Sequence, residues 1–282
     1  MMSVEIQPTM EQLFAQDGRA LRVALFQPPF PVLKGVIQLV HGFGEGIEHY
    51  DELACDFAMQ GYLTVVHDQR GFGKEVSKKE RGIVASYEVL LTDLQVVSGH
   101  LQAHYSELPL FLYGFSMGGN IALNLVLRDP FVYEKCVVVA PWLANHKPLQ
   151  KGLKWSVDVL GKLSPRLRIR TFLRPTHISR NVGKLLHLRQ AGVFHDILSL
   201  RLFSQILHMS EQLMLQASRL STPTLVIMAG RDKIVCNHAI RQFLYQSSQQ
   251  VRYHVYEEGY HCLHFEPERT QLVKDVLVFF TA

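Results

Sequence analysis

The sequence predicts an α/β fold in which helices cover both faces of a mostly parallel sheet. Short β-rich runs alternate with longer helical patterns along the chain. Several of these runs are continuously apolar, as expected of strands buried on both faces. The chain has 282 residues, of which 48% are hydrophobic and 19% are charged, so it is long enough and apolar enough to form a sizeable core.

Seven short apolar or β-branched runs are the predicted strands. They lie at residues 21–26, 35–40, 62–67, 108–114, 135–140, 223–229 and 251–256. The first two are joined by the proline-rich stretch QPPFPVLKG, and we expect them to form an antiparallel hairpin at one edge of the sheet. Helical patterns are predicted at residues 50–59, 87–105, 117–128, 238–246 and 267–280.

The alternation of strands and helices stops at Pro141 and resumes at Pro223. The intervening residues contain no convincing strand and consist of amphipathic, basic helical pieces. We therefore expect an α/β core formed by residues 1–140 and 223–282, with residues 141–222 inserted as a helical cap.

Charge is distributed unevenly between these two parts. The predicted cap has 13 Lys and Arg against three acids, a net charge of +10, whereas the remainder has 16 basic and 22 acidic residues, a net charge of −6. Such a cap could contact anionic lipid at a membrane surface, or it could be a solvated face that keeps the cap soluble. Nucleic acid is not an expected partner, because the sequence contains no recognised nucleic-acid motif.

The sequence favours a cytoplasmic protein, with or without peripheral membrane contact. Its N-terminus, MMSVEIQPTMEQLFAQDGRA, lacks the apolar segment of a signal peptide, and no run of 18 apolar residues is present. Cys55, Cys136, Cys236 and Cys262 are scattered without a C-x-x-C pair, which is typical of reduced thiols. Cys236, Cys262 and His261 do not have the spacing of a zinc site, so we expect no metal.

A candidate nucleophile lies directly after the run 108–114. The residues Gly114-Phe115-Ser116-Met117-Gly118 match G-x-S-x-G, the pattern of a serine on a sharp turn between a strand and a helix. Glycines flank the serine because side chains there would collide as the backbone doubles back. Alone, this short pattern is weak evidence for catalysis.

An acid and a base follow at the appropriate later positions. Asp232 follows the run 223–229, and His261 and His264 both follow the run 251–256. These loops lie at the carboxyl ends of predicted strands, at the same edge of the sheet as Ser116. A serine needs a base to remove its proton and a third group to orient that base. The residues alone leave His261 and His264 both open as the base.

Two backbone N–H groups are candidates for an oxyanion hole. Met117 follows the nucleophile and opens the predicted helix, while Phe43 lies between two glycines in the loop after the run 35–40.

Together, the motifs HGFGEGIEHY, HDQRGFGK, YGFSMGGN, MAGRDKIV and YHCLHFE resemble the monoacylglycerol lipase and lysophospholipase branch of the α/β-hydrolases. The resemblance implies that Ser116 is the nucleophile, Asp232 the acid and His261 the base. It also places Phe43 and Met117 at the oxyanion hole. It implies catalysis without a metal or organic cofactor, and a helical cap that shapes an apolar acyl tunnel and often touches membranes.

Three positions depart from the family's pattern. Phe72 and Glu75 replace a common histidine and serine, and Asn181 replaces a frequent aspartate in the cap. These differences concern substrate detail and not the reaction. The sequence therefore predicts a serine ester hydrolase acting on a single-acyl lipid, either a monoacylglycerol or a lysophospholipid.

Two alternatives to this function remain: a serine carboxylesterase or aminopeptidase of another substrate class, and a non-catalytic ligand-binding protein on a hydrolase scaffold. An aminopeptidase would want carboxylates near the pocket to bind an α-ammonium group, and the predicted cap has few. A non-catalytic ligand-binding protein would have no need for a triad together with oxyanion donors. The sequence carries no signal about oligomeric state.

Overall fold

A computed structural model describes residues 6–171 and 173–282. Within this part of the chain, one large sheet has the order β1-β2-β4-β3-β5-β6-β9-β10. Its strands are β1 (Thr9–Phe14), β2 (Ala20–Phe26), β3 (Gly35–Val40), β4 (Tyr62–His67), β5 (Leu110–Phe115), β6 (Lys135–Val139), β9 (Thr224–Ala229) and β10 (Val251–Tyr256). From β4 to β10 every neighbouring pair is parallel. The predicted α/β fold with a mostly parallel sheet is confirmed.

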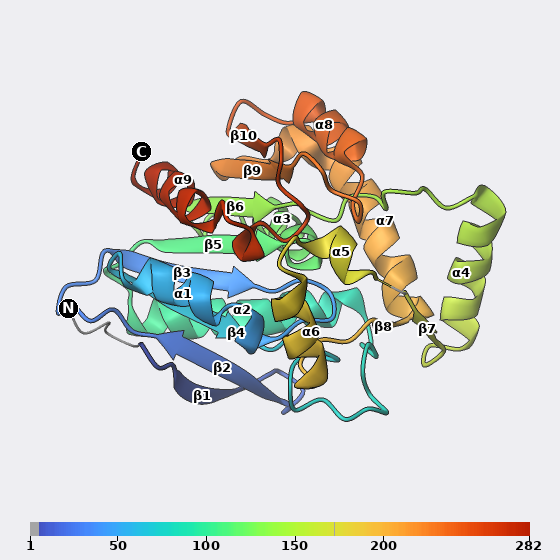
Figure 1. Cartoon of the computed structure of the whole chain (residues 1–282), viewed down its shortest axis with the longest axis horizontal. Coiled ribbons are helices and arrows are strands. Elements are labelled where there is room, and N and C mark those ends of the chain that lie inside the picture. The colour runs from blue at the N-terminus through green and yellow to red at the C-terminus, as the bar shows by residue number, and fades with distance from the viewer. Residues whose placement is uncertain (1–5, 172) are drawn as a thin grey trace.

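Helices cover both faces of this sheet (Figure 1). In the order of the chain they are α1 (Asp51–Ala58), α2 (Tyr87–His104), α3 (Met117–Arg128), α4 (Lys151–Leu163), α5 (Pro175–Ile178), α6 (Val182–Gln190), α7 (Leu200–Gln216), α8 (Asn237–Gln246) and α9 (Arg269–Thr281). Helices α1 and α9 contact each other on the near face, whereas α2 and α3 lie behind the sheet. Short 3₁₀ turns occur at Ile47–His49, Ala217–Arg219 and Leu263–Phe265.

The central strands are apolar because both of their faces are covered. Every residue of β3, β4, β5 and β9 is buried. Their carboxyl ends all lie at the same end of the sheet, on the right in Figure 1, which is where parallel α/β sheets place their sites.

The predicted hairpin between the first two apolar runs is wrong. Strand β4 lies between β2 and β3, and β2 pairs with it in the antiparallel direction. The fully buried run of β3 belongs in the centre of the sheet, where both faces are covered. The edge hairpin is instead formed by β1 and β2. Strand β1 was not predicted, since its sequence TMEQLF mixes polar and apolar residues without a strong apolar pattern, and most of the strand is exposed.

Residues 141–222 contribute α4 to α7 beyond the carboxyl ends of the strands (Figure 1). The expectation that this segment contains no strand is wrong, because β7 (Arg168–Arg170) and β8 (Ile197–Ser199) form a small antiparallel pair. Each has three residues, too few to show a period of two. Among the described residues, no helix combines the length and the apolar character needed to cross a bilayer.

Candidate active site

Ser116 occupies a strained turn between β5 and α3. Its backbone has φ 52° and ψ −113°, a left-handed φ that is uncommon for a residue with a side chain. The glycines around it are required by close packing. A Cβ on Gly114 would lie 2.5 Å from the Gly118 carbonyl oxygen, and a Cβ on Gly118 would lie 2.1 Å from the Val40 carbonyl oxygen. The sequence G-x-S-x-G therefore permits β3, β5 and α3 to meet at this turn.

The structure brings Ser116, His261 and Asp232 together. Ser116 Oγ lies 3.0 Å from His261 Nε2, and His261 Nδ1 lies 2.6 Å from Asp232 Oδ2. The other carboxylate oxygen accepts the backbone N–H groups of Ile234 and Val235, at 2.7 and 2.9 Å. The side chain of Asp232 is thereby fixed with one oxygen toward the imidazole. A hydrogen on Nδ1 leaves Nε2 free to accept the serine proton.

His264, the other candidate base, lies elsewhere. Its ring is completely enclosed, stacks on Tyr50 with ring centroids 4.8 Å apart, and contacts the edge of Phe115. Burial lowers the pKa of His264 well below its ordinary value. The geometry therefore joins His261, and not His264, to Ser116 and Asp232.

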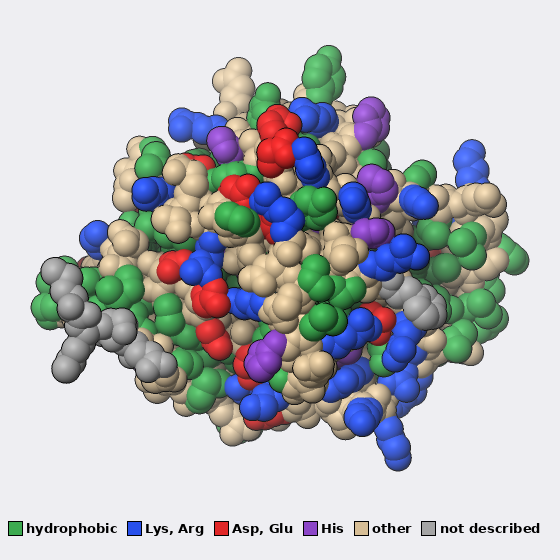
Figure 2. All heavy atoms as spheres, viewed as in Figure 1, with side chains coloured by type: hydrophobic (Ala, Val, Ile, Leu, Met, Phe, Trp, Pro, Cys, Tyr) green, Lys and Arg blue, Asp and Glu red, His purple; other side chains and the backbone are tan. Residues whose placement is uncertain are grey.

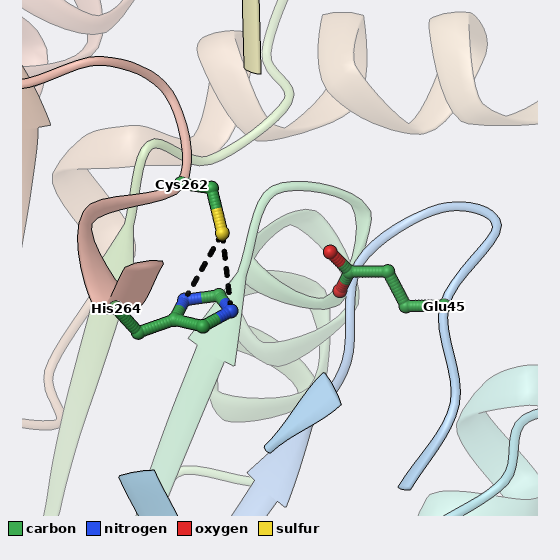
Figure 3. Close-up of side chains that lie close together, drawn as sticks. All are labelled: Glu45, Cys262 and His264. Atoms are coloured by element: carbon green, nitrogen blue, oxygen red, sulfur yellow. Dashed lines mark hydrogen bonds between the residues drawn. The ribbon is translucent and has the colours of Figure 1, made fainter. Parts of the chain in front are cut away.

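A buried polar cluster beside the site was missed by sequence reasoning. Figure 3 shows Glu45, from the loop after β3, facing Cys262 and His264, from the loop after β10. One potential ligand atom from each lies within 4.8 Å of the others, close enough for a metal ion. Burial raises the pKa of Glu45 to about 7 and the pKa of the Cys262 thiol well above its usual value. Both shifts favour the neutral forms of these side chains.

The hydrogen bonds of Glu45 relate this cluster to the predicted oxyanion loop. Oε2 of Glu45 accepts the Gly42 N–H at 2.8 Å and the Tyr50 O–H at 2.6 Å. Because Gly42 immediately precedes Phe43, the hydrogen bond from its N–H to Glu45 fixes the start of the Phe43 loop. No short motif contains Glu45, Cys262 and His264 together, so only the folded chain makes them neighbours.

Residues 141–222 also make contacts that hold the Phe43 loop. The carbonyl of Gly44 accepts the His195 N–H at 2.9 Å, and a Cβ on Gly44 would lie 2.0 Å from the His195 carbonyl oxygen. Gly44 has φ +79°, a conformation that favours glycine. Met117, the other predicted oxyanion residue, begins α3, where the first N–H groups have no acceptor within the helix.

Phe72, which departs from the family pattern, packs against this loop. Its buried ring stacks on His195 with centroids 5.3 Å apart and meets Phe43 edge-on at 5.8 Å. Glu75 is exposed and near Arg22. Asn181 caps α6, accepting the Lys184 N–H at 3.3 Å.

Ser116 and His261 open into a pocket of about 780 Å³. Most of its wall is apolar, and residues 141–222 supply much of it. The apolar lining residues are Phe43, Phe115, Trp142, Leu149, Ile169, Leu173, Ile178, Phe194, Phe203 and Ile234. The basic and histidine lining residues besides His261 are His146, Lys147, Arg170, Arg174, His177 and Lys233. A pocket of this size can hold a ligand with a long apolar chain.

The fold and this arrangement of residues define the chain as an α/β-hydrolase. The family model described as serine aminopeptidase, S33, matches residues 31–268. The chain therefore belongs to this family.

Relatives in the family include lipases. An abhydrolase domain-containing protein of Dictyostelium discoideum is 30% identical over 95% of this chain, which spans only 28% of that relative's length. A putative monoglyceride lipase of Schizosaccharomyces pombe is 26% identical over 82% of the chain and 62% of its own length. The monoglyceride lipase of Rattus norvegicus is 28% identical over 94% of the chain and 87% of its own length.

The fold is likewise similar to that of solved lipases. A soluble variant of the monoglyceride lipase of Saccharomyces cerevisiae, solved with a substrate analogue, aligns with a TM-score of 0.84. The alignment covers 98% of this chain and 94% of that one at 20% sequence identity. The chain is thus an α/β-hydrolase similar to the monoglyceride lipases.

Proposed function

We propose that the chain is a serine ester hydrolase that cleaves single-acyl lipids, either monoacylglycerols or lysophospholipids. The observation that carries this proposal is the hydrogen-bonded series Ser116, His261 and Asp232 at the base of a large, mostly apolar pocket. The similarity to monoglyceride lipases supports the same substrate class.

In this proposal Ser116 attacks the carbonyl carbon of the ester. His261 Nε2 accepts the serine proton as the new C–O bond forms, and Asp232 stabilises the resulting imidazolium. The bond from the carbonyl carbon to the glycerol oxygen then breaks, and the imidazolium returns its proton to that oxygen. Water, activated by the same histidine, releases the fatty acid and restores the serine.

The oxyanion of the tetrahedral intermediate would be stabilised by the N–H groups of Phe43 and Met117. Losing one such donor costs about 3 kcal/mol of transition-state stabilisation in a typical serine hydrolase. Glu45, Phe72 and His195 would act as positioning residues, because they contact the Phe43 loop or its flanking glycines.

Residues 141–222 would form a cap over the acyl chain. Ile169, Leu173, Ile178, Phe194 and Phe203 from this segment face the pocket that Ser116 enters. Burying an acyl chain against them would supply roughly 0.8 kcal/mol per methylene group, so the cap would favour long esters over short ones.

The pocket gives little support to an aminopeptidase. Among its described lining residues, Glu45 is the one carboxylate, and its Oε2 already accepts two hydrogen bonds. A pKa of about 7 also makes it a poor counter-ion for a substrate ammonium group. A non-catalytic binding protein would not need His261 aligned on Ser116.

The test is hydrolysis by the purified full chain and by Ser116→Ala. The panel contains monoacylglycerols, lysophospholipids, short p-nitrophenyl esters and aminoacyl amides, and a fluorophosphonate probe reports a reactive serine. We expect long single-acyl esters to be the best substrates and Ser116→Ala to lose both hydrolysis and labelling. Hydrolysis that survives Ser116→Ala would overturn the mechanism, and activity on short esters or amides alone would overturn the lipid substrate.

A further inference from the structure

We infer that the pocket selects single-acyl lipids whose headgroup carries a net negative charge next to the ester, such as a phosphate on the glycerol. This inference rests on the proposed function and narrows its substrate class. The feature that carries it is a group of cations, Lys147, Arg174 and Lys233, on the wall of the same pocket as Ser116.

These three cations come from separate parts of the chain. Lys147 follows β6, Arg174 immediately precedes α5, and Lys233 adjoins Asp232 in the loop after β9. All three are exposed to solvent, as a group that meets a polar headgroup should be. The fold thus brings positive charge to the pocket from both the core and the inserted segment.

Carboxylates do not neutralise this group. In the described part of the chain, no ion pair joins Lys147, Arg174 or Lys233 to an acid, and Lys233 Nζ instead lies 5.3 Å from the ring centroid of Tyr260. Three arginines of the inserted segment, by contrast, are paired with acids. Arg170 and Arg189 lie 3.4 and 3.0 Å from Asp196, and Arg180 pairs with Glu266 and Glu268. Lys147, Arg174 and Lys233 are therefore available to a ligand, whereas Arg170, which also lines the pocket, is paired with Asp196.

Their charges act together on the histidine beside them. The pKa of His177, another lining residue, is lowered first by partial desolvation and then by the positive charges of Lys233 and Arg174. His146 and Lys147 lower it further. An anion at this position would therefore meet a field from several groups at once.

The molecular surface beyond the pocket also carries positive charge. Figure 2 shows Lys and Arg side chains gathered over the region of α6, β7 and β8, with few acids among them. Such a surface would draw an anionic substrate toward the pocket. Within the pocket, the apolar wall would take the acyl chain. The cations would take the phosphate, which only the glycerol carbons separate from the ester.

The test compares substrates with the same oleoyl chain. They are lysophosphatidic acid and lysophosphatidylglycerol, which are anionic, lysophosphatidylcholine, which is zwitterionic, and monooleoylglycerol, which is neutral. Each is assayed at low and high salt with the wild type and with the triple variant Lys147→Gln, Arg174→Gln, Lys233→Gln. The matched control, Lys74→Gln, Lys79→Gln, Lys274→Gln, removes three exposed cations that do not line the pocket. Thermal melting verifies that both variants fold.

We expect kcat/KM for the anionic lipids to exceed that for monooleoylglycerol by about tenfold or more, and to fall as salt is added. The pocket variant should lose that ratio and the control variant should keep it. An equal kcat/KM for anionic and neutral lipids would overturn the inference, and so would an anionic-to-neutral kcat/KM ratio that the pocket variant leaves unchanged. In either case, hydrolysis that depends on Ser116 would still support the proposed function.

Short-chain analogues below their micellar concentration distinguish a headgroup site from a membrane-docking surface. A preference that persists with these monomers supports headgroup recognition inside the pocket. A preference that appears only when the substrate is presented in anionic vesicles would assign the cations to the membrane and overturn the inference. Absence of hydrolysis of every ester would reject the proposed function itself.

Discussion

Asp232 uses one carboxylate oxygen to hold His261 and the other to hold its own loop. Oδ2 lies 2.6 Å from His261 Nδ1, and Oδ1 accepts the N–H groups of Ile234 and Val235. In Asp232→Asn the amide oxygen can keep the loop contacts, but the amide N–H₂ then faces Nδ1 and favours the opposite imidazole tautomer. We expect kcat to fall by about 10⁴-fold, with the free energy of unfolding changed by less than about 1 kcal/mol.

Steady-state kinetics and urea unfolding of Asp232→Asn measure these two quantities. A loss of activity below about tenfold would contradict the orienting role given to Asp232. A large loss of stability would instead show that the carboxylate mainly supports its loop.

Gly118 should be intolerant of even a methyl group. Its Cβ would lie 2.1 Å from the Val40 carbonyl oxygen, so Gly118→Ala forces α3 away from β3. We expect a loss of about 3 kcal/mol of stability. The matched control is Gly99→Ala in α2, where a Cβ meets nothing within 4 Å. An unfolded chain with alanine has less conformational entropy to lose than one with glycine, so Gly99→Ala should stabilise the fold by about 0.5–1 kcal/mol. Chemical denaturation measures the free energy of unfolding of both variants. A Gly118→Ala protein as stable as the wild type would contradict the prediction.

The chain order of the motifs made the proximity of the three central residues of the candidate site predictable from sequence. Ser116, Asp232 and His261 each follow a short apolar or β-branched run that forms a strand, and parallel strands bring their carboxyl ends to one edge. The fold class followed from the same runs, since strands buried on both faces have a strong apolar signal.

Features that depend on long-range packing were not predictable in this way. Strand β1 is a mostly exposed edge whose sequence mixes polar and apolar residues, so no periodicity distinguished it from a loop. The approach of Glu45 to Cys262 and His264 and the stacking of Phe72 on His195 join segments that no motif relates. The positioning of the Phe43 loop therefore became visible only in the folded chain.

Glu45 should make stability depend on pH in a specific direction. Burial raises its folded pKa from 4.5 to about 7, so the folded state binds the proton more tightly than the unfolded state does. Its contribution to stability is fully present below pH 4.5 and is lost as the pH rises to about 7. Glutamine resembles the protonated side chain and does not titrate. Glu45→Gln should therefore gain stability relative to the wild type across this range, by up to about 3 kcal/mol.

Urea unfolding of both proteins at several pH values between 4.5 and 8 isolates this difference. Groups that do not interact with Glu45 contribute equally to the two proteins and cancel. A stability difference that does not change with pH would show that Glu45 titrates normally.

The exposed side of α4 should bind an anionic membrane. Trp155 is 68% exposed and Leu163 75% exposed, whereas the other tryptophan, Trp142, is only 8% exposed. Figure 2 shows hydrophobic side chains gathered at the end of the molecule where α4 lies. The helix packs closely on α7, since a Cβ on Gly161 would lie 3.1 Å from the Arg201 backbone. Its outer side chains thus remain free to enter a lipid interface, with Lys151 and Lys162 near the headgroups.

Tryptophan fluorescence in the presence of vesicles measures this contact. We expect the emission to shift to shorter wavelengths with vesicles containing phosphatidylglycerol, to shift less with pure phosphatidylcholine, and to return as salt is added, because screening weakens exposed charge pairs. Trp155→Phe should abolish the shift, since Trp142 already lies in the pocket wall. An equal shift with neutral vesicles would assign binding to the apolar side chains alone. If neither lipid shifts the emission, α4 does not bind membranes. The positive charge of residues 141–222 would then serve the substrate pocket and the solvated surface around it.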